Sequence, residues 1–317
     1  MLVGWALAGL ATAASAADAY PVKPIRMVVG FPAAGISDGI ARILAKILAQ
    51  DSGLQVVIDN RPGAGTTIAA DHVAKSAADG YTLFMQDMTT HAINASLYRK
   101  LPYDSIKDFT PVTLVASTPL VLVVHPSLPV KNVKELIALA KSRPGQVIYG
   151  SSGVGTIIHL AGETFKKRAD VDLVHVPYKS GTLAVLGIIG GEIAATFAPM
   201  PAAMPMIKAG KVRALAVTTL KRAAVIPDIP TVAEAALPGF DIVLYSGVLG
   251  PAGLPKDVLM RLNSEIAKAV NSPEVKAYYT AVSADPITST PEEFAAHMAS
   301  EMVKLGRAVR DSGARAD

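Results

Sequence analysis

Three segments rich in glycine, serine and threonine have the composition of anion-binding loops. They cover residues 31–38, 149–156 and 176–182, and each lies between a β-branched run and a helical pattern. Backbone N–H groups in the first turn of a helix have no partner within the helix, and the helix dipole favours negative charge there. Any one segment is also typical of an ordinary helix cap with a flexible turn. Three together, at strand ends, favour one ligand cleft for a small anion.

The second segment does not match the catalytic and nucleotide-binding motifs of similar composition. The run GSSGVG is not a G-x-S-x-G nucleophile elbow, because Val154 stands where the last glycine is needed, and it lacks the Gly-Lys ending of a P-loop. Neither GFPAAG nor GAGTTI fits the G-x-G-x-x-G dinucleotide pattern. One enzymatic alternative stays open, a secreted hydrolase or transferase that uses Ser152 with His159. Because His159 and Glu163 have the spacing of a structural helix pair, we favour a binding protein that is not an enzyme.

The composition excludes several other kinds of site. The chain has no cysteine, which excludes disulfides, thiol catalysis and cysteine-ligated metals. Its 6 histidines form no H-x-x-x-H pair and no ligand cluster, so we expect no metal and no cofactor. The net charge of +4 and the pI near 9.1 arise from basic residues scattered among acidic ones. This pattern favours a small anionic ligand over nucleic acid.

Short strand-like runs alternate with helical patterns, which predicts an α/β fold with parallel strands and crossover helices. The helix after the first anion-binding segment begins at Ser37 or Asp38, and Gly53 follows its end. Its apolar face is formed by Ile40, Ile43, Leu44, Ile47 and Leu48. Near the other end of the chain, Thr290 and Glu293 have the spacing of a capping box that begins a helix.

Two extended runs, residues 110–127 and 240–255, lack a crossover helix at the usual spacing and are predicted to pass between two lobes. With 317 residues, of which 51% are hydrophobic, the chain is long enough for about two domains. We predict one lobe from residues 20–117 and 246–317 and a second lobe from residues 118–245. Each lobe should contain a mixed sheet flanked by helices.

The first 16 residues are uncharged and mostly apolar, and they end in Ala14-Ser15-Ala16, which is typical of a secretory signal peptide and its cleavage site. The alternative is a buried N-terminal helix. No lysine or arginine precedes the apolar run, where a signal peptide normally has one, so we expect the natural start to lie upstream of Met1. No later apolar run reaches the roughly 18 residues of a membrane span. The sequence therefore predicts a secreted protein.

Eight segments make the sequence resemble the substrate-binding proteins of tripartite tricarboxylate transporters, the Bug or TctC-like family, over essentially the whole chain after the signal peptide. In the order that the family has them, they are PIRMVVGFPAAGISDGIAR, VVIDNRPGAGTTIAADHVAKSAADGYTL, THAINASLY, DFTPVTLVASTPLVLVVHPSLP, YGSSGVGTIIHLAGETF, HVPYKSGTLAVLGIIGGEI, GKVRALAVTT and DIPTVAEAALPGF. No single segment is decisive, but together and in this order they are.

The resemblance implies a two-lobed periplasmic-binding-protein fold of type II and a location in the periplasm. It implies a ligand carboxylate held between the lobes by backbone amides, hydroxyls and water, and delivery to a two-subunit inner-membrane permease. Carried over by position, the ligand-binding residues would be Phe31, Pro32, Ala33, Ala34, Gly35, Ile36, Ser37, Asp38, Thr89, Thr90, His91, Ser151, Ser152, Gly153, Val154, Thr156, Tyr178, Lys179 and Ala198.

We also expect a monomer that binds no nucleic acid. Two alternatives keep the binding function but change the partner. An orphan member would present its ligand to a sensor instead of a permease. The effector domain of a LysR-type regulator has a similar two-lobed form, but the predicted signal peptide and the absence of a helix-turn-helix segment argue against it.

The sequence departs from the family in places that concern the ligand. Where members commonly have an acidic residue after Phe197, this chain has Ala198-Pro199-Met200. Tyr245 stands where many members have tryptophan, and Gln86-Asp87-Met88 replaces a segment that is usually smaller and more neutral. We therefore expect a carboxylate without an amino group and with an apolar body. The residues expected to line its cleft are Ile36, Val154, Ala198, Pro199 and Met200.

Overall fold

The computed structural model describes residues 20–33 and 35–312. The predicted signal peptide, Ala34 and residues 313–317 lie outside the described residues. The chain begins with β1 (Ile25–Val29), α1 (Ile36–Ser52), β2 (Val56–Asn60), the 3-10 turn η1 (Ala64–Thr66), α2 (Thr67–Ala74), β3 (Thr82–Asp87) and α3 (Met88–Leu97). It continues with β4 (Phe109–Val124), α4 (Val133–Ser142), β5 (Val147–Ser151), α5 (Ile157–Ala169), β6 (Leu173–Pro177), α6 (Gly181–Ile189), β7 (Ala195–Pro199), α7 (Met200–Lys208), β8 (Arg213–Val217) and α8 (Val232–Ala235). It ends with β9 (Val243–Pro251), α9 (Lys256–Asn271), α10 (Pro273–Ala281), β10 (Asp285–Pro286) and α11 (Pro291–Ser312).

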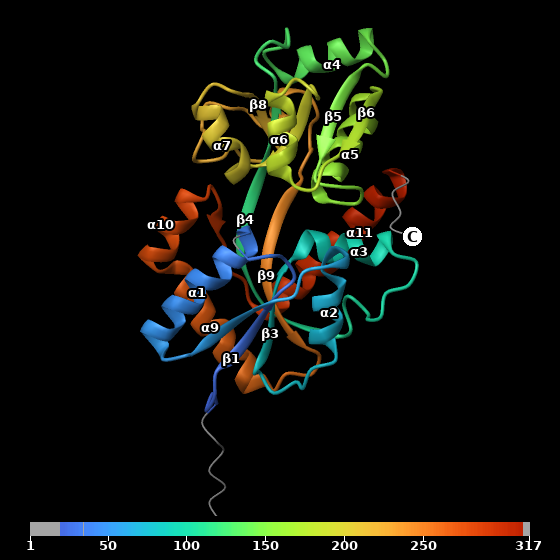
Figure 1. The fold of residues 1–317 in the computed structure, drawn as a ribbon. Helices are drawn as coiled ribbons and strands as arrows, with labels where there is room; N and C mark the ends of the chain where they lie inside the picture. The colour runs from blue at the N-terminus through green and yellow to red at the C-terminus, as the bar shows by residue number, and fades with distance from the viewer. Residues whose placement is uncertain (1–19, 34, 313–317) are drawn as a thin grey trace, which may run out of the picture.

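Strand β4 belongs to both halves of the sheet, and Figure 1 shows it running between two lobes beside β9. Residues 109–119 of β4 pair with β9, whereas residues 120–124 pair with β7 and β8. The order continues through β3, β1 and β2 on one side and through β5 and β6 on the other. The predicted α/β fold with two lobes is therefore confirmed, and β4 and β9 coincide with the two predicted crossing runs.

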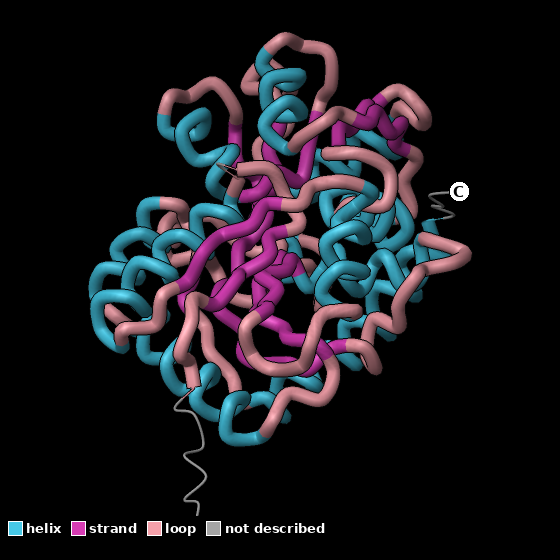
Figure 2. Tube along the Cα trace, turned by 60° about the horizontal axis from the view of Figure 1, so that its bottom comes forward, coloured by secondary structure: helices cyan, strands magenta, loops and turns pink. Residues whose placement is uncertain are grey.

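Helices cover both faces of each half of the sheet (Figure 2). Because neighbouring residues of a strand point to opposite faces, Leu122 packs with α4 and α5, while Val123 packs with α6 and α7. In the other lobe, Met27 packs with α1 and α9, whereas Val28 packs with α2. A strand that is buried on both faces has a continuous apolar sequence, which is why these strands can be recognised in the sequence.

The predicted ends of two helices are confirmed. Helix α1 is followed by Gly53, whose φ of 69° lies in the left-handed region that glycine adopts without strain. At the start of α11, the Glu293 N–H donates to Thr290 Oγ1 over 3.1 Å, and the Thr290 N–H donates to Glu293 Oε2 over 2.9 Å. These two bonds form the predicted capping box.

Helix α11 contacts both lobes. Phe294 and Met298, in its first half, belong to the apolar core of the lobe that contains β1. Leu305 and Val309, in its second half, belong to the core that contains α4 and α5. The predicted lobe boundaries placed the whole of this helix in one lobe, and they stay a prediction. No helix within the described residues is long and apolar enough to cross a membrane.

Candidate functional site

The carboxyl ends of two sets of parallel strands meet near the middle of β4. Strands β1, β2 and β3 run parallel in one lobe, and β5, β6 and β7 run parallel in the other. Asp87, at the end of β3, pairs with Ser246 of β9, which pairs with Ala116 of β4. Pro199, at the end of β7, pairs with Leu120 of β4. Four residues of strand span about 13 Å, so loops that follow both sets can reach one ligand.

A pocket of about 390 Å³ lies at the first of these loops. Its volume falls within the range of small-molecule sites. It is lined by Phe31, Pro32, Ala33, Gly35, Ile36, Ser37, Asp87 and Leu244. The first six are predicted site residues, which the structure therefore brings together. Asp87 and Leu244 were not predicted as contacts, although the sequence showed Asp87 as a departure from the family.

Asp87 supplies the one ionisable side chain among these lining residues, and it caps helix α3. Its Oδ1 accepts the Thr89 N–H over 2.8 Å and the Thr90 N–H over 3.1 Å, and its Oδ2 accepts the Thr90 hydroxyl over 2.8 Å. Burial raises the pKa of this carboxyl, against the lowering effect of those bonds. The start of α3 therefore presents an acid to the pocket instead of free N–H donors.

Helix α1 begins differently, because its N-cap residue, Gly35, has no side chain that could accept a hydrogen bond. The N-cap of α7, Pro199, also lacks such an acceptor, whereas Thr156 and Ser180 cap α5 and α6. The first-turn N–H groups of α1 therefore face the pocket without an N-cap acceptor. Positive partial charge at this end of the helix favours a bound anion.

Asp38, in the first turn of α1, does not oppose an anion strongly, because its charge is paired. Its side chain is 3% exposed and lies 2.9 Å from Arg42 Nε. Asn60 donates to Asp38 Oδ1 over 2.9 Å and to the Phe31 carbonyl over 3.0 Å. Asp38 therefore helps to position the first loop from outside the pocket.

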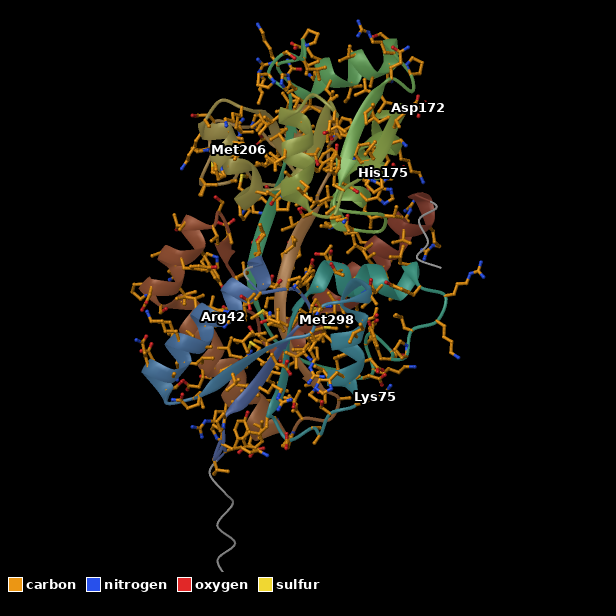
Figure 3. All side chains as sticks on the ribbon, in the orientation of Figure 1. Arg42, Lys75, Asp172, His175, Met206 and Met298 are labelled. Carbon is orange, nitrogen blue, oxygen red and sulfur yellow. The ribbon has the colours of Figure 1, made fainter. Side chains whose placement is uncertain are left out.

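The second loop, residues 151–156, is held by a buried serine and a half-buried histidine. Ser151 Oγ accepts the Gly153 N–H over 3.0 Å and lies 2.6 Å from His175 Nε2 on the neighbouring strand. Thr156 Oγ1 donates to the Gly153 carbonyl over 2.8 Å. Figure 3 shows His175 in the same lobe as β5 and β6. These contacts fix the backbone of the loop that precedes α5.

A second histidine extends this network along α5. The Gly155 N–H donates to His159 Nδ1 over 3.1 Å, and the rings of His159 and His175 lie 4.2 Å apart between centroids. Burial lowers the pKa of both histidines. The pKa of His175 falls to about 4, because repulsion by the His159 ring adds to the effect of burial. Both rings are neutral at pH 7. At this loop the serine–histidine contact is Ser151 with His175, and not the Ser152 with His159 of the hydrolase alternative.

Several predicted contacts lie in the protein interior. His91 is fully buried, its Nε2 lies 2.8 Å from the Ser105 carbonyl oxygen, and burial lowers its pKa to about 4. Thr89 Oγ1 donates to the Val243 carbonyl over 3.3 Å. Ala198 and Met200 are 0% exposed, so their side chains pack in the core of their lobe and do not line a cleft in this structure. Sequence position alone could not distinguish these from surface residues.

The remaining predicted contacts surround the second and third loops. Val154 is 51% exposed, Lys179 is exposed and Ser152 is half-buried. The Tyr178 hydroxyl donates to Glu192 Oε2 over 2.8 Å, and its pKa is raised, first by burial and then by that carboxylate. These residues do not line the pocket at the first loop, and their role as contacts stays a prediction.

The fold and the facing strand ends define a two-lobed binding protein of the periplasmic class. A family model described as "Tripartite tricarboxylate transporter family receptor" (TctC) matches residues 40–314. The chain therefore belongs to this family of receptors.

Relatives and solved structures agree with this assignment. Protein BugT of Bordetella pertussis is 38% identical over 311 residues, which cover 98% of this chain and 95% of BugT. A structure of R. palustris Rpa4515 with adipate has a TM-score of 0.83 at 35% identity, covering 93% of this chain and 98% of that one. A structure of MatC (Rpa3494) from Rhodopseudomonas palustris with bound malate has a TM-score of 0.79 at 29% identity, covering 92% and 100%.

Proposed function

We propose that this protein is a periplasmic receptor, not an enzyme, which captures a small organic carboxylate between its lobes for a two-subunit membrane permease. The observation that carries the proposal is the start of α1 at Gly35, inside a pocket of about 390 Å³. Its first-turn N–H groups offer donors to a carboxylate, and the helix dipole adds favourable charge. No covalent step and no cofactor is needed for this function.

The lining of the pocket suggests a carboxylate with an apolar body. Phe31, Ile36 and Leu244 supply apolar walls, which favour methylene or aromatic groups. The related structures contain adipate and malate, both dicarboxylates. Asp87 places negative charge near one wall, so the ligand carboxylate should bind toward α1 and away from α3. A ligand amine could pair with Asp87, which makes acidic amino acids the competing class.

Closure of the lobes would complete the site. Ser152, Tyr178 and Lys179 lie on loops of the second lobe, and closing those loops over the ligand would add hydroxyl and ammonium donors that the first pocket lacks. A ligand that contacts both lobes favours the closed form by its differential affinity for that form. The closed form is then what a permease recognises, or a sensor if this member is an orphan. We expect one chain to be sufficient for binding.

The test is a thermal-shift panel of mono-, di- and tricarboxylates, aromatic acids and acidic amino acids. A ligand present at 100 times its dissociation constant stabilises by about 2.7 kcal/mol, which should raise the Tm by about 4 to 8 °C. Ile36→Glu places a negative charge in the pocket wall and should abolish the shift. Ile68→Glu, at a 53% exposed position on α2, is the matched control and should keep it. No shift with any acid, or an equal shift in Ile36→Glu, would contradict the proposal.

A further inference from the structure

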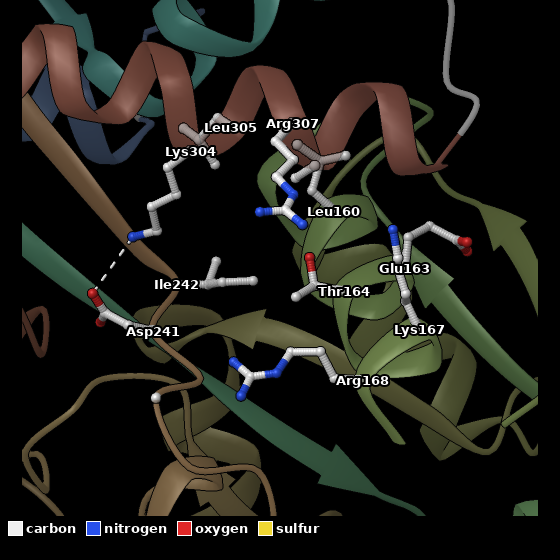
Figure 4. Close-up of a pocket in the computed structure, with 12 residues that line it drawn as sticks. Leu160, Glu163, Thr164, Lys167, Arg168, Asp241, Ile242, Lys304, Leu305 and Arg307 are labelled. Atoms are coloured by element: carbon white, nitrogen blue, oxygen red, sulfur yellow. Dashed lines mark hydrogen bonds and ion pairs between the residues drawn. The ribbon is translucent and has the colours of Figure 1, made fainter. Parts of the chain in front are cut away.

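A second pocket, of about 460 Å³, lies between α5, residues 239–242 and α11 (Figure 4). It is lined by Leu160, Glu163, Thr164, Lys167, Arg168, Gly239, Asp241, Ile242, Lys304, Leu305, Arg307 and Ala308. The second anion-binding loop precedes the N-terminus of α5, whereas this pocket is lined by residues 160–168, further along the same helix. The site is therefore separate from the pocket at α1, and the two share no lining residue.

The charges of this second pocket favour an anion. Its lining side chains include four cations, Lys167, Arg168, Lys304 and Arg307, but only two acids. Both acids already have partners: Asp241 Oδ2 lies 3.4 Å from Lys304 Nζ, and Glu163 Oε1 lies 3.2 Å from Lys166 Nζ and 2.6 Å from the Tyr149 hydroxyl. Lys304 Nζ also lies 3.2 Å from Glu301 Oε1, so with Lys166 and Glu301 counted there are five cations and three acids, and a bound anion would still meet a surplus of positive charge.

Two guanidinium groups reach this space from different walls. Arg168 comes from the last turn of α5 and Arg307 from α11, and Figure 4 shows Thr164 and Ile242 between their guanidinium groups in that view. Arg168 is oriented by a bond to the Pro238 carbonyl and lies over the Phe240 ring, 6.0 Å from its centroid. A guanidinium group held as that of Arg168 is suits the planar geometry of a carboxylate.

The floor of the pocket is apolar. Leu160, Ile242 and Leu305 are 0%, 5% and 2% exposed, and all three belong to one continuous core. They come from three segments that are far apart in the sequence, so the cavity exists only in the folded chain. An apolar floor beneath a cationic rim matches a molecule with an apolar body and one anionic end.

We propose that this pocket is a second ligand site, which binds a small carboxylate with an apolar body. The carboxylate lies between Arg168 and Arg307, and the apolar body lies against Ile242, Leu305 and Ala308, the apolar lining residues that keep some exposed surface. The inference does not depend on the function proposed for the pocket at α1, because it uses none of its residues. Since Phe294 and Met298 anchor α11 in the other lobe, an occupant of this pocket contacts segments attached to both lobes.

Octanoate is the probe, because it has one carboxylate and a seven-carbon apolar tail, and octan-1-ol is its neutral match. Calorimetric titration should give saturable octanoate binding that Arg168→Gln and Arg307→Gln each weaken by about fivefold to tenfold. Both arginines are exposed, so these variants should fold normally. Ala308→Leu, which leaves every charge in place and reduces the space, should weaken both octanoate and octan-1-ol.

Two controls decide where octanoate binds. Lys276→Gln removes an exposed positive charge from α10, outside the pocket, and should leave the affinity unchanged. Ile36→Glu blocks the pocket at α1 and should also leave octanoate binding in place. Loss of binding in Ile36→Glu would place octanoate in the first pocket and overturn the second site. Equal affinities of Arg168→Gln, Arg307→Gln and the unchanged protein would overturn it too, as would the absence of saturable binding.

Discussion

Ser151 Oγ lies 2.6 Å from His175 Nε2, and this contact joins the end of β5, where the second loop begins, to the middle of β6. The serine also accepts the Gly153 N–H, so one hydroxyl connects the sheet edge to the loop backbone. Ser151 is 0% exposed, which makes it unavailable as a nucleophile. The pair therefore acts as a support for a loop that the proposed ligand would contact.

Ser151→Ala should weaken both folding and ligand binding. The substitution leaves the Gly153 N–H and the His175 ring without a buried partner, which should cost about 2 kcal/mol of unfolding free energy and about tenfold in carboxylate affinity. Urea denaturation and calorimetry measure the two effects. Ser127→Ala is the control, because Ser127 Oγ lies 2.6 Å from His125 Nδ1 in an exposed pair. If both variants behave alike, the buried pair has no positioning role.

Acid should destabilise the protein between about pH 6.5 and pH 4. Burial lowers the pKa of His91 and of His175 to about 4, so the unfolded chain binds more protons than the folded chain over this range. The contribution of these histidines to the free energy of unfolding is complete above pH 6.5, the pKa of an unfolded histidine, and is lost as the pH falls through their pKa in the folded protein. For the fully buried His91, this contribution to the free energy of unfolding is about 3 kcal/mol. Asp87, whose pKa is raised, acts in the opposite direction and reduces the loss.

Urea denaturation at pH 7, 5.5 and 4 measures this dependence. His175→Gln keeps a polar side chain but cannot titrate, so its free energy of unfolding should fall less steeply than that of the unchanged protein. The difference between the two curves gives the contribution of His175 to the pH dependence separately from that of the carboxyl groups. Parallel curves would show that His175 keeps the pKa of an unfolded histidine.

Asp87→Asn should raise the affinity for a carboxylate by about fivefold. The asparagine oxygen can still accept the Thr89 N–H, so the cap of α3 is kept while a negative charge leaves the pocket wall. Asp257→Asn, at an exposed first-turn position of α9, is the matched control and should not change the affinity. A weaker affinity in Asp87→Asn would show that the ligand directs a cation or a hydrogen-bond donor at this residue.

Gly155→Ala should disturb the contact between the second loop and α3. Gly155 has a φ of +77°, and a Cβ there would lie 2.5 Å from Leu97 Cδ2. Gly191 has a φ of +75° with nothing within 4 Å of a Cβ, so Gly191→Ala carries the backbone strain alone, roughly 1–2 kcal/mol. Gly155→Ala should cost about 1–3 kcal/mol more. Urea denaturation compares the two.

Leu97→Ala provides the test of this explanation. If the alanine at position 155 clashes with Leu97, the double variant should be more stable than the sum of the two single effects implies. Additive effects would mean that the loop strain, and not the contact with Leu97, accounts for the loss.

The sequence by itself determined the features that depend on neighbouring residues. The apolar spacing after Ser37 and the glycine at position 53 located α1, and Thr290 with Glu293 located the start of α11, because helix ends are set by local hydrogen bonds. The glycine-rich loops were found for the same reason. Six of their residues, from Phe31 to Ser37 without Ala34, line the first pocket.

Only the tertiary structure decided which side chains meet. His91 was expected at the ligand, but packing against Tyr103 and a contact with the Ser105 carbonyl bury it. Ser151 and His175 are 24 residues apart, and the pairing of β5 with β6, which places Tyr149 opposite His175 and Ser151 opposite Pro177, makes them diagonal neighbours. Asp87 lines the pocket because β3 and the loop after β1 end at the same sheet edge. Local patterns set where a helix or strand begins, whereas pairing and packing between distant segments set which residues share a site.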